Sequence, residues 1–422
     1  MSHDLAVGQP FRVGVNYWPR RKAMYWWQDF DRAEVADEFD IILDLGMSLV
    51  RIFLLWEDFQ PTPRAVSPTA LADLETVCDL AEARGLGLDV TFFTGHMSGP
   101  NWVPAWLLGG NEPVPGDRQV ISGSDRAAGS HRAAGSHRAP GSYRNPFVDA
   151  EARHAATLLL RQVVGNLRDH AGVWAWNLGN EPDLFALPPD EAAGPDWARS
   201  LFGVIRELDD HHHVTLGLHA PSLTERNGLR ADRMFEQADL AAMHAYPIYA
   251  NLGARMLDPD AVPFATALTA ALSGKPTLME EFGACTAPPG QATTTWQWAA
   301  LGQTWQQVML SEEALAEHLA EVLPRLVEVG ASGALLWCFA DYHADLWDRP
   351  PCDTKMHERH FGLMRPDGSL KPHAEVVRRF IAADPVIVAA SARARIEVHA
   401  EAFYADPSAM LPGLFEAFRS AR

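Results

Sequence analysis

The sequence predicts an α/β protein built as a (β/α)₈ barrel. Eight short runs rich in β-branched, aromatic and aliphatic residues recur along the chain, and helix-like stretches lie between them. The runs are almost continuously apolar, as expected for parallel strands that are covered on both faces. A doubly wound open sheet is the alternative, but no glycine-rich phosphate turn follows the first run. The eight predicted strands lie at 11–17, 48–56, 87–96, 172–180, 214–220, 239–249, 276–284 and 333–343.

The intervening stretches carry helix signals. Helical patterns span 33–46, 67–85 and 311–330, and Ser67 and Ser311 are the expected N-caps of the last two. The length of 422 residues would permit two or three domains, but α/β barrels often reach this size with long loops. We therefore expect a single domain, with a barrel core of about 11–382 and a short helical appendage at 383–422.

Composition narrows the class of partner. The formal net charge of −19 opposes binding to nucleic acid, which requires a cationic surface. The N-terminal segment has no cationic stretch followed by an apolar one, so we expect a cytoplasmic protein without a membrane partner. Four well-separated cysteines indicate neither disulfides nor a zinc site. The histidines at 211–213, 357 and 360 match no metal motif and are expected at the surface or in turns, so no metal or cofactor is predicted. The oligomeric state stays open.

Polar side chains recur where the predicted strands end, on the face where barrel loops converge around one cavity. The segment GVWAWNLGNEPDLF places Asn180 and Glu181 after the fourth strand, and MEEFG places Glu281 after the seventh. Two such glutamates can face each other across a ligand, as cleavage of a glycosidic bond requires. Paired carboxylates also bind divalent metals, usually with further acidic or histidine ligands. Strand alternation should send Glu280 to the opposite face from Glu281, toward a helix or behind the site.

In combination these motifs resemble clan A of the glycoside hydrolases, and most closely family 5, from Phe11 to about Ala382. The resemblance implies that Glu181 is the acid/base and Glu281 the nucleophile. The segments GVNYWPRRKAMYWW and VRIFLLWEDFQP are most similar to an intracellular bacterial branch associated with β-mannosidase activity. The resemblance also implies supporting roles at the substrate for Arg51, His96, Asn180, His244, Tyr246 and Trp337.

Elementary chemistry gives several of these residues a role. A cation at Arg51 and a hydrogen bond from Tyr246 would favour the ionised form of Glu281. His244, beside Glu181, would help to set the protonation of that carboxyl. His96 has the alternative of a hydrogen-bonded core histidine.

Further contacts with the sugar are expected from the loops. Tyr17 and Trp18, after the first strand, can stack on the apolar face of a pyranose. Asp341 and His343, after the eighth strand, can bind sugar hydroxyls, with a solvated loop as the equal alternative. Segment 126–144 repeats a six-residue unit three times on the same face. It either shapes access to the cavity or is an idle expansion, because a longer loop costs little closure entropy.

The expected activity is that of a retaining exo-β-mannosidase that hydrolyses short β-linked manno-oligosaccharides by double displacement. Its two carboxyls should then lie ~5–5.5 Å apart, against ~6.5–9.5 Å in an inverting enzyme. An endo-β-1,4-mannanase, a β-glucanase or a β-glucosidase is the alternative among enzymes. A sugar-binding barrel that lacks catalysis is the alternative from a different class.

Overall fold

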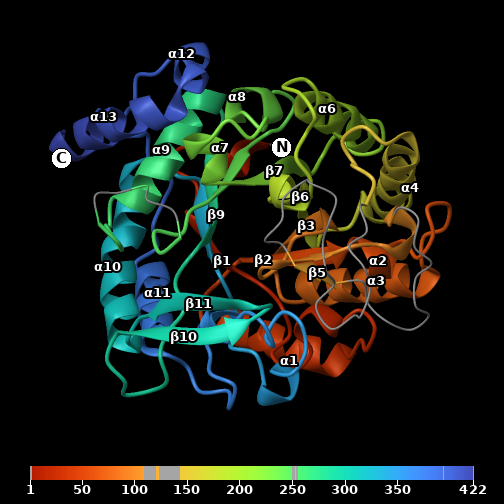
Figure 1. Ribbon diagram of the computed structural model, residues 1–422, viewed down its shortest axis with the longest axis horizontal. Coiled ribbons are helices and arrows are strands. Elements are labelled where there is room, and N and C mark those ends of the chain that lie inside the picture. The colour runs from red at the N-terminus through yellow and green to blue at the C-terminus, as the bar shows by residue number, and fades with distance from the viewer. Residues whose placement is uncertain are drawn as a thin grey trace.

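The computed structural model describes residues 2–108, 120–122, 143–249, 252, 255–392 and 394–421. Eight parallel strands close into a barrel in the order β1-β12-β9-β8-β7-β6-β3-β2 (Figure 1). All eight lie in the predicted runs, and β7 begins one residue early, so the predicted (β/α)₈ fold is confirmed. The strands are β1 Arg12–Asn16, β2 Leu49–Leu55, β3 Gly87–Thr94, β6 Val173–Asn180, β7 His213–His219, β8 Ala241–His244, β9 Thr277–Phe282 and β12 Gly333–Leu336.

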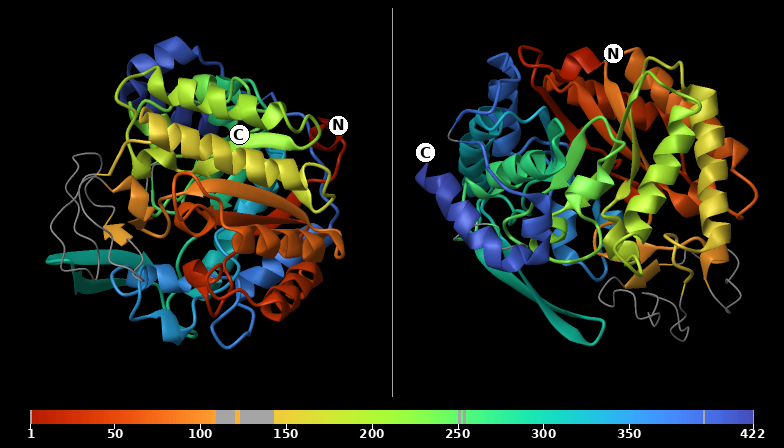
Figure 2. Two further views of the ribbon diagram at one scale, coloured as in Figure 1. Left: turned by 90° about the vertical axis from the view of Figure 1, so that its right-hand side faces the viewer. Right: turned by 90° about the horizontal axis from the view of Figure 1, so that it is seen from above.

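Helices surround the barrel (Figure 2). The predicted N-caps are confirmed, since Ser67 accepts a hydrogen bond from the Ala70 N–H and Ser311 from the Ala314 N–H. The longer helices are α1 Arg32–Asp44, α3 Pro68–Glu82, α4 Ala150–Leu167, α6 Ala193–Arg206, α9 Ala261–Ser273, α10 Glu312–Glu328, α11 Pro372–Ala382 and α13 Pro407–Ser420. The short ones are α2 Trp56–Phe59, α5 Pro182–Phe185, α7 Pro221–Thr224, α8 Ala231–Met234 and α12 Ala400–Ala405, with 3₁₀ turns at η1 Ser2–Leu5, η2 Ala23–Tyr25, η3 Ala105–Leu107, η4 Ala344–Leu346 and η5 Met356–His360. Within the described ranges, none of these helices is long and apolar enough to cross a membrane.

The strands are buried on both sides, which explains their near-continuous apolar sequence. All residues of β2 and β6 are buried, against the helices outside and other strand residues inside. Toward the carboxyl ends of the strands, however, the barrel interior is polar. Its buried polar side chains are Asn16, Arg51, Asp89, Thr91, Asn177, Thr215, His244 and Glu280.

Two small antiparallel pairs lie outside the barrel, and neither was predicted. β4 Pro100–Trp102 pairs with β5 Val120–Ser122. β10 Thr294–Ala300 pairs with β11 Gln303–Met309, and this hairpin projects from the body of the molecule (Figure 2). Its two-residue turn consists of Leu301 and Gly302, both with positive φ, which is the conformation that matches the twist of a hairpin.

The C-terminal residues return to the barrel. Phe415 and Phe418 of α13 pack against Phe264 of α9, with ring centroids 5.1 and 5.5 Å apart. The Tyr404 hydroxyl donates to the Ser222 carbonyl and accepts from the Ala231 N–H. These contacts place α13 beside the loop that follows β7. The repeat at 126–144 lies outside the described residues, apart from its last two positions.

Candidate active site

Glu181 lies where the chain leaves β6. Its backbone is left-handed, with φ 47° and ψ 57°, a conformation that residues other than glycine seldom adopt and that collects at functional sites. The Glu181 N–H donates to the Gly217 carbonyl of β7 at 3.0 Å. Pro182 then begins α5, at the helix position that suits proline. The Asn-Glu-Pro sequence is therefore a sharp turn out of a buried strand, and it presents the Glu181 side chain at the barrel mouth.

Glu281 lies at the end of β9, opposite Glu181, and is hydrogen bonded on both of its oxygens. Nη1 of Arg51 donates to Oε1 at 2.5 Å, and the Tyr246 hydroxyl donates to Oε2 at 2.8 Å. Arg51 also donates to Oδ1 of Asn180 at 3.0 Å. The contacts expected from the sequence for Arg51 and Tyr246 are thus present.

Glu280 does not point toward a helix, which was one of the two positions expected for it. The register of β9 against β8 shifts between Met279 and Glu281, and this bulge turns both consecutive glutamates toward Arg51. Oε2 of Glu280 lies 3.2 Å from Nη2 of Arg51 and 2.9 Å from Nε2 of His244. Its Oε1 accepts from Asn177 at 2.9 Å. Glu280 is fully buried beneath the site and does not line the cavity.

Gly217 makes room for this ionic cluster. A Cβ at this position of β7 would lie 2.8 Å from Oε2 of Glu280 and from Nε2 of His244, and 2.9 Å from Nη2 of Arg51. Real Cβ atoms do not approach polar atoms so closely, so any side chain here would displace the cluster. The glycine in VTLGLHA is therefore a requirement of the site.

His244 joins the two sides of the site. Its Nδ1 lies 2.9 Å from Oε1 of Glu181, and its Nε2 lies 2.9 Å from Oε2 of Glu280. One carboxylate oxygen of Glu181, one of Glu281 and one ring nitrogen of His244 all lie within 4.8 Å of one another. The structure therefore brings together the two glutamates that the sequence singled out.

A second histidine, His219 of β7, also supports Glu181. Its Nδ1 lies 3.6 Å from Oε2 of Glu181, and its Nε2 lies 2.8 Å from a carboxylate oxygen of Asp183. His219 was not among the predicted site residues, although it ends β7 just as His244 ends β8.

The charges of this cluster shift the pKa values of its members. Burial lowers the pKa of His244, but Glu281, Glu181 and Glu280 outweigh burial and raise the pKa to about 9. Burial raises the pKa of Glu181, but His219 and His244 outweigh it and hold that pKa well below its ordinary value. Burial raises the pKa of Glu281 by more than His244 and Arg51 lower it. These shifts favour a protonated His244 beside an ionised Glu181.

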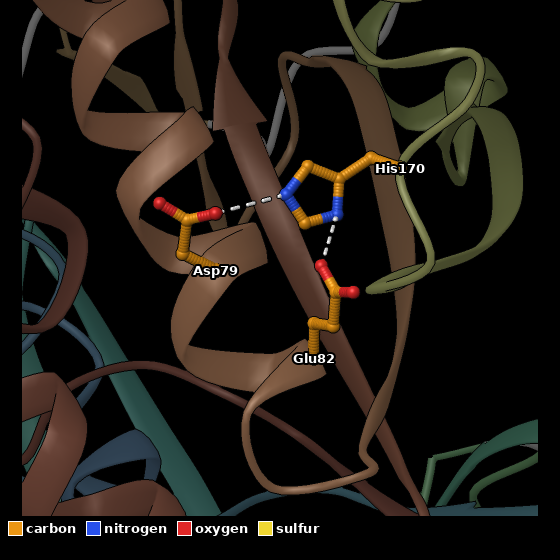
Figure 3. A group of neighbouring side chains, drawn as sticks. All are labelled: Asp79, Glu82 and His170. Atoms are coloured by element: carbon orange, nitrogen blue, oxygen red, sulfur yellow. Dashed lines mark hydrogen bonds and ion pairs between the residues drawn. The ribbon is translucent and has the colours of Figure 1, made fainter.

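Two groups of acidic and histidine side chains have the spacing of metal ligands. In the site itself, both nitrogens of His244 already bond to carboxylates, and Glu281 is neutralised by Arg51. The other group is Asp79 and Glu82 of α3 with His170, which precedes β6 at the opposite end of the barrel (Figure 3). His170 lies 3.2 Å from Asp79 and 3.5 Å from Glu82, so these contacts join α3 to the start of β6. Neither group requires a metal to account for its contacts.

A cavity of about 830 Å³ opens above the two glutamates. Among the residues that the sequence predicted at the substrate, those that line it are His96, Asn180, Glu181, His244, Tyr246, Glu281 and Trp337. Arg51 lies directly beneath, bonded to Glu281. His96 is held by a 2.8 Å contact between its Nδ1 and Oδ1 of Asn101.

Besides Arg51, four predicted contact residues do not line the cavity. Tyr17 is fully buried, and its hydroxyl donates to Glu38 of α1 at 2.8 Å. Trp18 is buried and stacks on Phe53 with ring centroids 4.9 Å apart. Tyr17 thus packs toward α1, and Trp18 is covered by Phe53, so neither ring presents a free face to the cavity.

Asp341 and His343 are directed elsewhere. Asp341 is buried and accepts hydrogen bonds from Nζ of Lys371 at 2.7 Å and from the Gly362 N–H at 2.8 Å. His343 caps the 3₁₀ turn η4 through the Asp345 N–H. Both residues therefore stabilise the loop after β12 instead of reaching the cavity.

Several residues that line the cavity come from outside the strand ends. The unpredicted hairpin supplies Trp298, Trp305, Gln306 and Gln307, and the C-terminal helix supplies Ser408, Leu411 and Pro412. The loop after β12 supplies Lys355, His357, Glu358 and Phe361. His357 was expected at the surface or in a turn, and this expectation is wrong in part. It lies in the turn η5 but is 7% exposed and faces the cavity.

Comparison with known proteins finds similarity to glycoside hydrolases. A family profile described as "Glycosyl hydrolases family 2, TIM barrel domain" matches residues 122–383. The "Probable mannan endo-1,4-beta-mannosidase F" of Aspergillus flavus is 28% identical over 150 residues, covering 32% of this chain and 32% of the relative. The chain thus aligns with about a third of the length of the curated relatives that it matches.

Solved structures share the fold. "Exo-beta-1,4-mannosidase Op5Man5" from Opitutaceae bacterium strain TAV5 is 24% identical with a TM-score of 0.69, covering 89% of this chain and 60% of that one. A variant of GH5_18 from Streptomyces cattleya in complex with Manb1-4GlcNAc is 22% identical with a TM-score of 0.74, covering 97% and 92%. At these identities the likeness shows the barrel alone.

The matching profile is thus that of family 2, whereas the sequence motifs resemble family 5. It covers more than half of the chain and includes both glutamates of the site. The chain therefore belongs to the family described as glycosyl hydrolases family 2, TIM barrel domain.

Proposed function

We propose that the protein is a retaining exo-β-mannosidase that removes single sugars from short β-linked manno-oligosaccharides. The observation that carries the proposal is the close pair of Glu181 and Glu281, with carboxylate oxygens within 4.8 Å of each other. A retaining enzyme needs about 5–5.5 Å between its carboxyl groups, and an inverting enzyme needs room for a water molecule. The spacing therefore favours double displacement over inversion.

In this mechanism Glu281 attacks the anomeric carbon while the bond to the leaving oxygen breaks. The hydrogen bonds from Arg51 and Tyr246 hold the Glu281 carboxylate in place and favour its charged form. Glu181 donates a proton to the leaving oxygen. A water molecule, deprotonated by Glu181, then attacks the glycosyl ester and releases the sugar with its original configuration.

His244 supplies the proton that Glu181 needs. Nδ1 of His244 lies 2.9 Å from Oε1 of Glu181, within reach for direct proton transfer. A bound sugar displaces water from around Glu181, and loss of solvation raises the pKa of a carboxyl. Substrate binding thus favours transfer of the proton from His244 to Glu181, whereas the hydrogen bonds from Arg51 and Tyr246 oppose the same effect of burial at Glu281.

The preference for manno-configured substrates rests on relatives. The curated relative from Aspergillus flavus has a name that describes a mannan endo-1,4-beta-mannosidase, and two solved relatives are an exo-mannosidase and a complex with Manb1-4GlcNAc. Together with the resemblance of GVNYWPRRKAMYWW and VRIFLLWEDFQP to a branch associated with β-mannosidase activity, these names favour a β-mannoside. The predicted cytoplasmic location fits short substrates and stays a prediction.

Exo action rests on the loops. The loops after β3 and β12 meet at the barrel mouth, where Gly99 lies against the side chain of Lys355. Tyr25, in the loop after β1, also donates to the Pro350 carbonyl of the loop after β12 at 2.8 Å. A chain passing through the site would meet this wall. An endo-β-1,4-mannanase is the second candidate, because the curated relative carries that name.

A panel of substrates tests the proposal. Aryl β-mannoside, aryl β-glucoside and manno-oligosaccharides of two to six units are incubated with the protein, and products are followed by chromatography and by NMR of the anomeric proton. We expect hydrolysis of the mannoside, stepwise release of mannose and initial formation of the β-anomer. Preference for the glucoside would overturn the assignment to mannosides. Internal cleavage of the hexamer would overturn exo action, and release of the α-anomer would overturn the retaining mechanism.

A further inference from the structure

Lys355 is the cationic residue on the cavity wall that the proposed mechanism does not use. It lies within the long loop after β12 and contacts two other segments. Its Nζ lies 3.3 Å from the centroid of the Trp305 ring on the hairpin. A Cβ built on Gly99 would lie 2.9 Å from two methylene carbons of Lys355, so the lysine stem packs tightly on the loop after β3.

The Lys355 ammonium has unused donors. In the described part of the chain it forms no ion pair, and its close neighbour is the π face of Trp305, which attracts a cation but accepts at most one of its hydrogens. Burial lowers the pKa of Lys355 to about 8, which shows how poorly solvated the charge is. Such a group gains from an acceptor that a ligand brings.

His357 provides an independent sign of a ligand. Its side chain is 7% exposed and lines the same cavity. Its Nδ1 is buried and lacks a hydrogen-bond partner among the described residues, whereas Nε2 lies 3.3 Å from Glu358. Buried polar atoms are seldom left unpaired. The ring centroids of His357 and Trp298 lie 5.5 Å apart. Trp298 pairs across the hairpin with Trp305, which Lys355 contacts, so His357 and Lys355 lie in the same corner of the cavity.

The position of this corner identifies which part of the substrate it meets. Glu181 must reach the glycosidic oxygen, so the leaving group extends along the wall near Glu181 that carries His219 and Pro221. We infer that the sugar that is cleaved off lies on the other side of the cavity, beside Trp337, which follows β12 and lines the cavity. Lys355 and His357 follow Trp337 on that same loop.

We propose that Lys355 and His357 form a recognition corner for the non-reducing sugar, in which they hydrogen bond to the hydroxyls farthest from the cleaved bond. The ligand class is a neutral pyranose with adjacent free hydroxyls at its non-reducing end. Lys355 also terminates the cavity, because its stem lies between Gly99 and Trp305. The inference rests on the proposed exo-mannosidase function and assigns its specificity to residues outside the strand ends.

Steady-state kinetics of full-length variants test the assignment. Lys355→Met keeps the stem but removes the donors, so KM for aryl β-mannoside should rise roughly ten- to a hundredfold, the loss expected for a charge-assisted hydrogen bond. The value of kcat should change less than about threefold, because the reacting atoms keep their partners. His357→Gln should raise KM in the same direction. Lys355→Arg restores a donor and should recover part of the loss.

Lys275→Met is the matched control, because Lys275, just before β9, donates to the Ala238 carbonyl ahead of β8 and does not line the cavity. Melting temperatures establish that each variant is folded. If Lys355→Met is not folded, Lys355→Gln takes its place. If KM of Lys355→Met stays within about twofold of the parent, the recognition corner is wrong. If KM rises for mannobiose but not for the aryl mannoside, Lys355 contacts the leaving group and the assignment is also wrong. Failure of the proposed function is seen differently. In that case the parent protein itself cleaves internally or prefers glucosides, before any variant is compared.

Discussion

Glu280 and Glu281 are consecutive residues of β9, and both direct their carboxylates to the guanidinium of Arg51. The bulge between Met279 and Glu281 makes this possible. The two glutamates then have different environments, since Glu280 is enclosed beneath the site and Glu281 faces the cavity. Glu280 anchors Arg51 and His244, which leaves Glu281 free to react.

Replacement of the proposed nucleophile tests this division of roles. Glu281→Gln keeps the size of the side chain but removes the attacking oxyanion, so turnover should fall by roughly 10⁴-fold or more. Sugar binding should remain, because the cavity is unchanged. Hydrolysis of aryl β-mannoside and calorimetric titration with mannose provide the two measurements. Glu321→Gln, at an exposed position of α10, is the control, and near-normal turnover in Glu281→Gln would reassign the nucleophile.

The proposed acid should show a dependence on the leaving group. Glu181→Gln cannot donate a proton, and loss of general acid catalysis typically costs about 10²–10⁴-fold. An aryl group with a low pKa needs little protonation, so its release should be affected far less than the release of a sugar. Comparison of dinitrophenyl and methylphenyl β-mannosides measures this contrast. Equal losses for both substrates would show that Glu181 is not the acid.

The proton held by His244 predicts the alkaline side of the pH profile. Its pKa is raised to about 9 by three carboxylates, so His244 is charged below that pH and loses its proton above it. The proposed transfer to Glu181 therefore requires pH below about 9, and kcat/KM should fall as pH rises through this value.

His244→Gln removes the titrating group, so the fall near pH 9 should disappear while the overall rate drops. His213→Gln serves as the control, since His213 pairs with Asp4 at the other end of β7. Rates from pH 5 to 10.5 are compared at constant ionic strength. An alkaline limb that is identical in parent and His244→Gln would exclude His244 as the source of the proton.

Sequence patterns predicted the barrel and its central pair because both follow from short-range rules. Near-continuous apolar runs mark strands that are buried on both faces, and polar residues after such runs converge at one end of the barrel. Glu181 and Glu281 satisfy these rules. Position after a strand was not enough for Tyr17 and Trp18, because the Tyr17 ring packs on Phe39 of α1 and the Trp18 ring is covered by Phe53.

The remaining wall of the cavity depends on contacts between distant loops, which no local pattern encodes. Lys355 meets the site only because the loop after β12 folds back onto Gly99. The hairpin did leave a local signal, since TTWQWAALGQTWQQVM alternates around a two-residue turn that ends in glycine. Its tryptophans at 298 and 305 pair directly across the two strands.

The contact that removes Tyr17 from the cavity has its own consequence for stability. Glu38, which accepts the Tyr17 hydroxyl, has its pKa raised to about 7, chiefly by burial. In the unfolded chain this carboxyl loses its proton near its ordinary value of 4.5. Between these values the folded protein binds more protons than the unfolded chain, so the free energy of unfolding falls as pH rises from 4.5 to 7.

Glu38→Gln stays neutral at every pH and keeps an oxygen that can accept from Tyr17. It should therefore be more stable than the parent by about 1–3 kcal/mol at pH 8 and nearly equal to it at pH 4.5. Urea unfolding at both pH values, followed by tryptophan fluorescence, measures the difference. Glu313→Gln, on the exposed face of α10, should show no such pH-dependent gain. Equal stability of Glu38→Gln and parent at pH 8 would mean that the folded protein solvates or pairs the Glu38 charge better than its burial among Tyr17, Glu34 and Arg20 indicates.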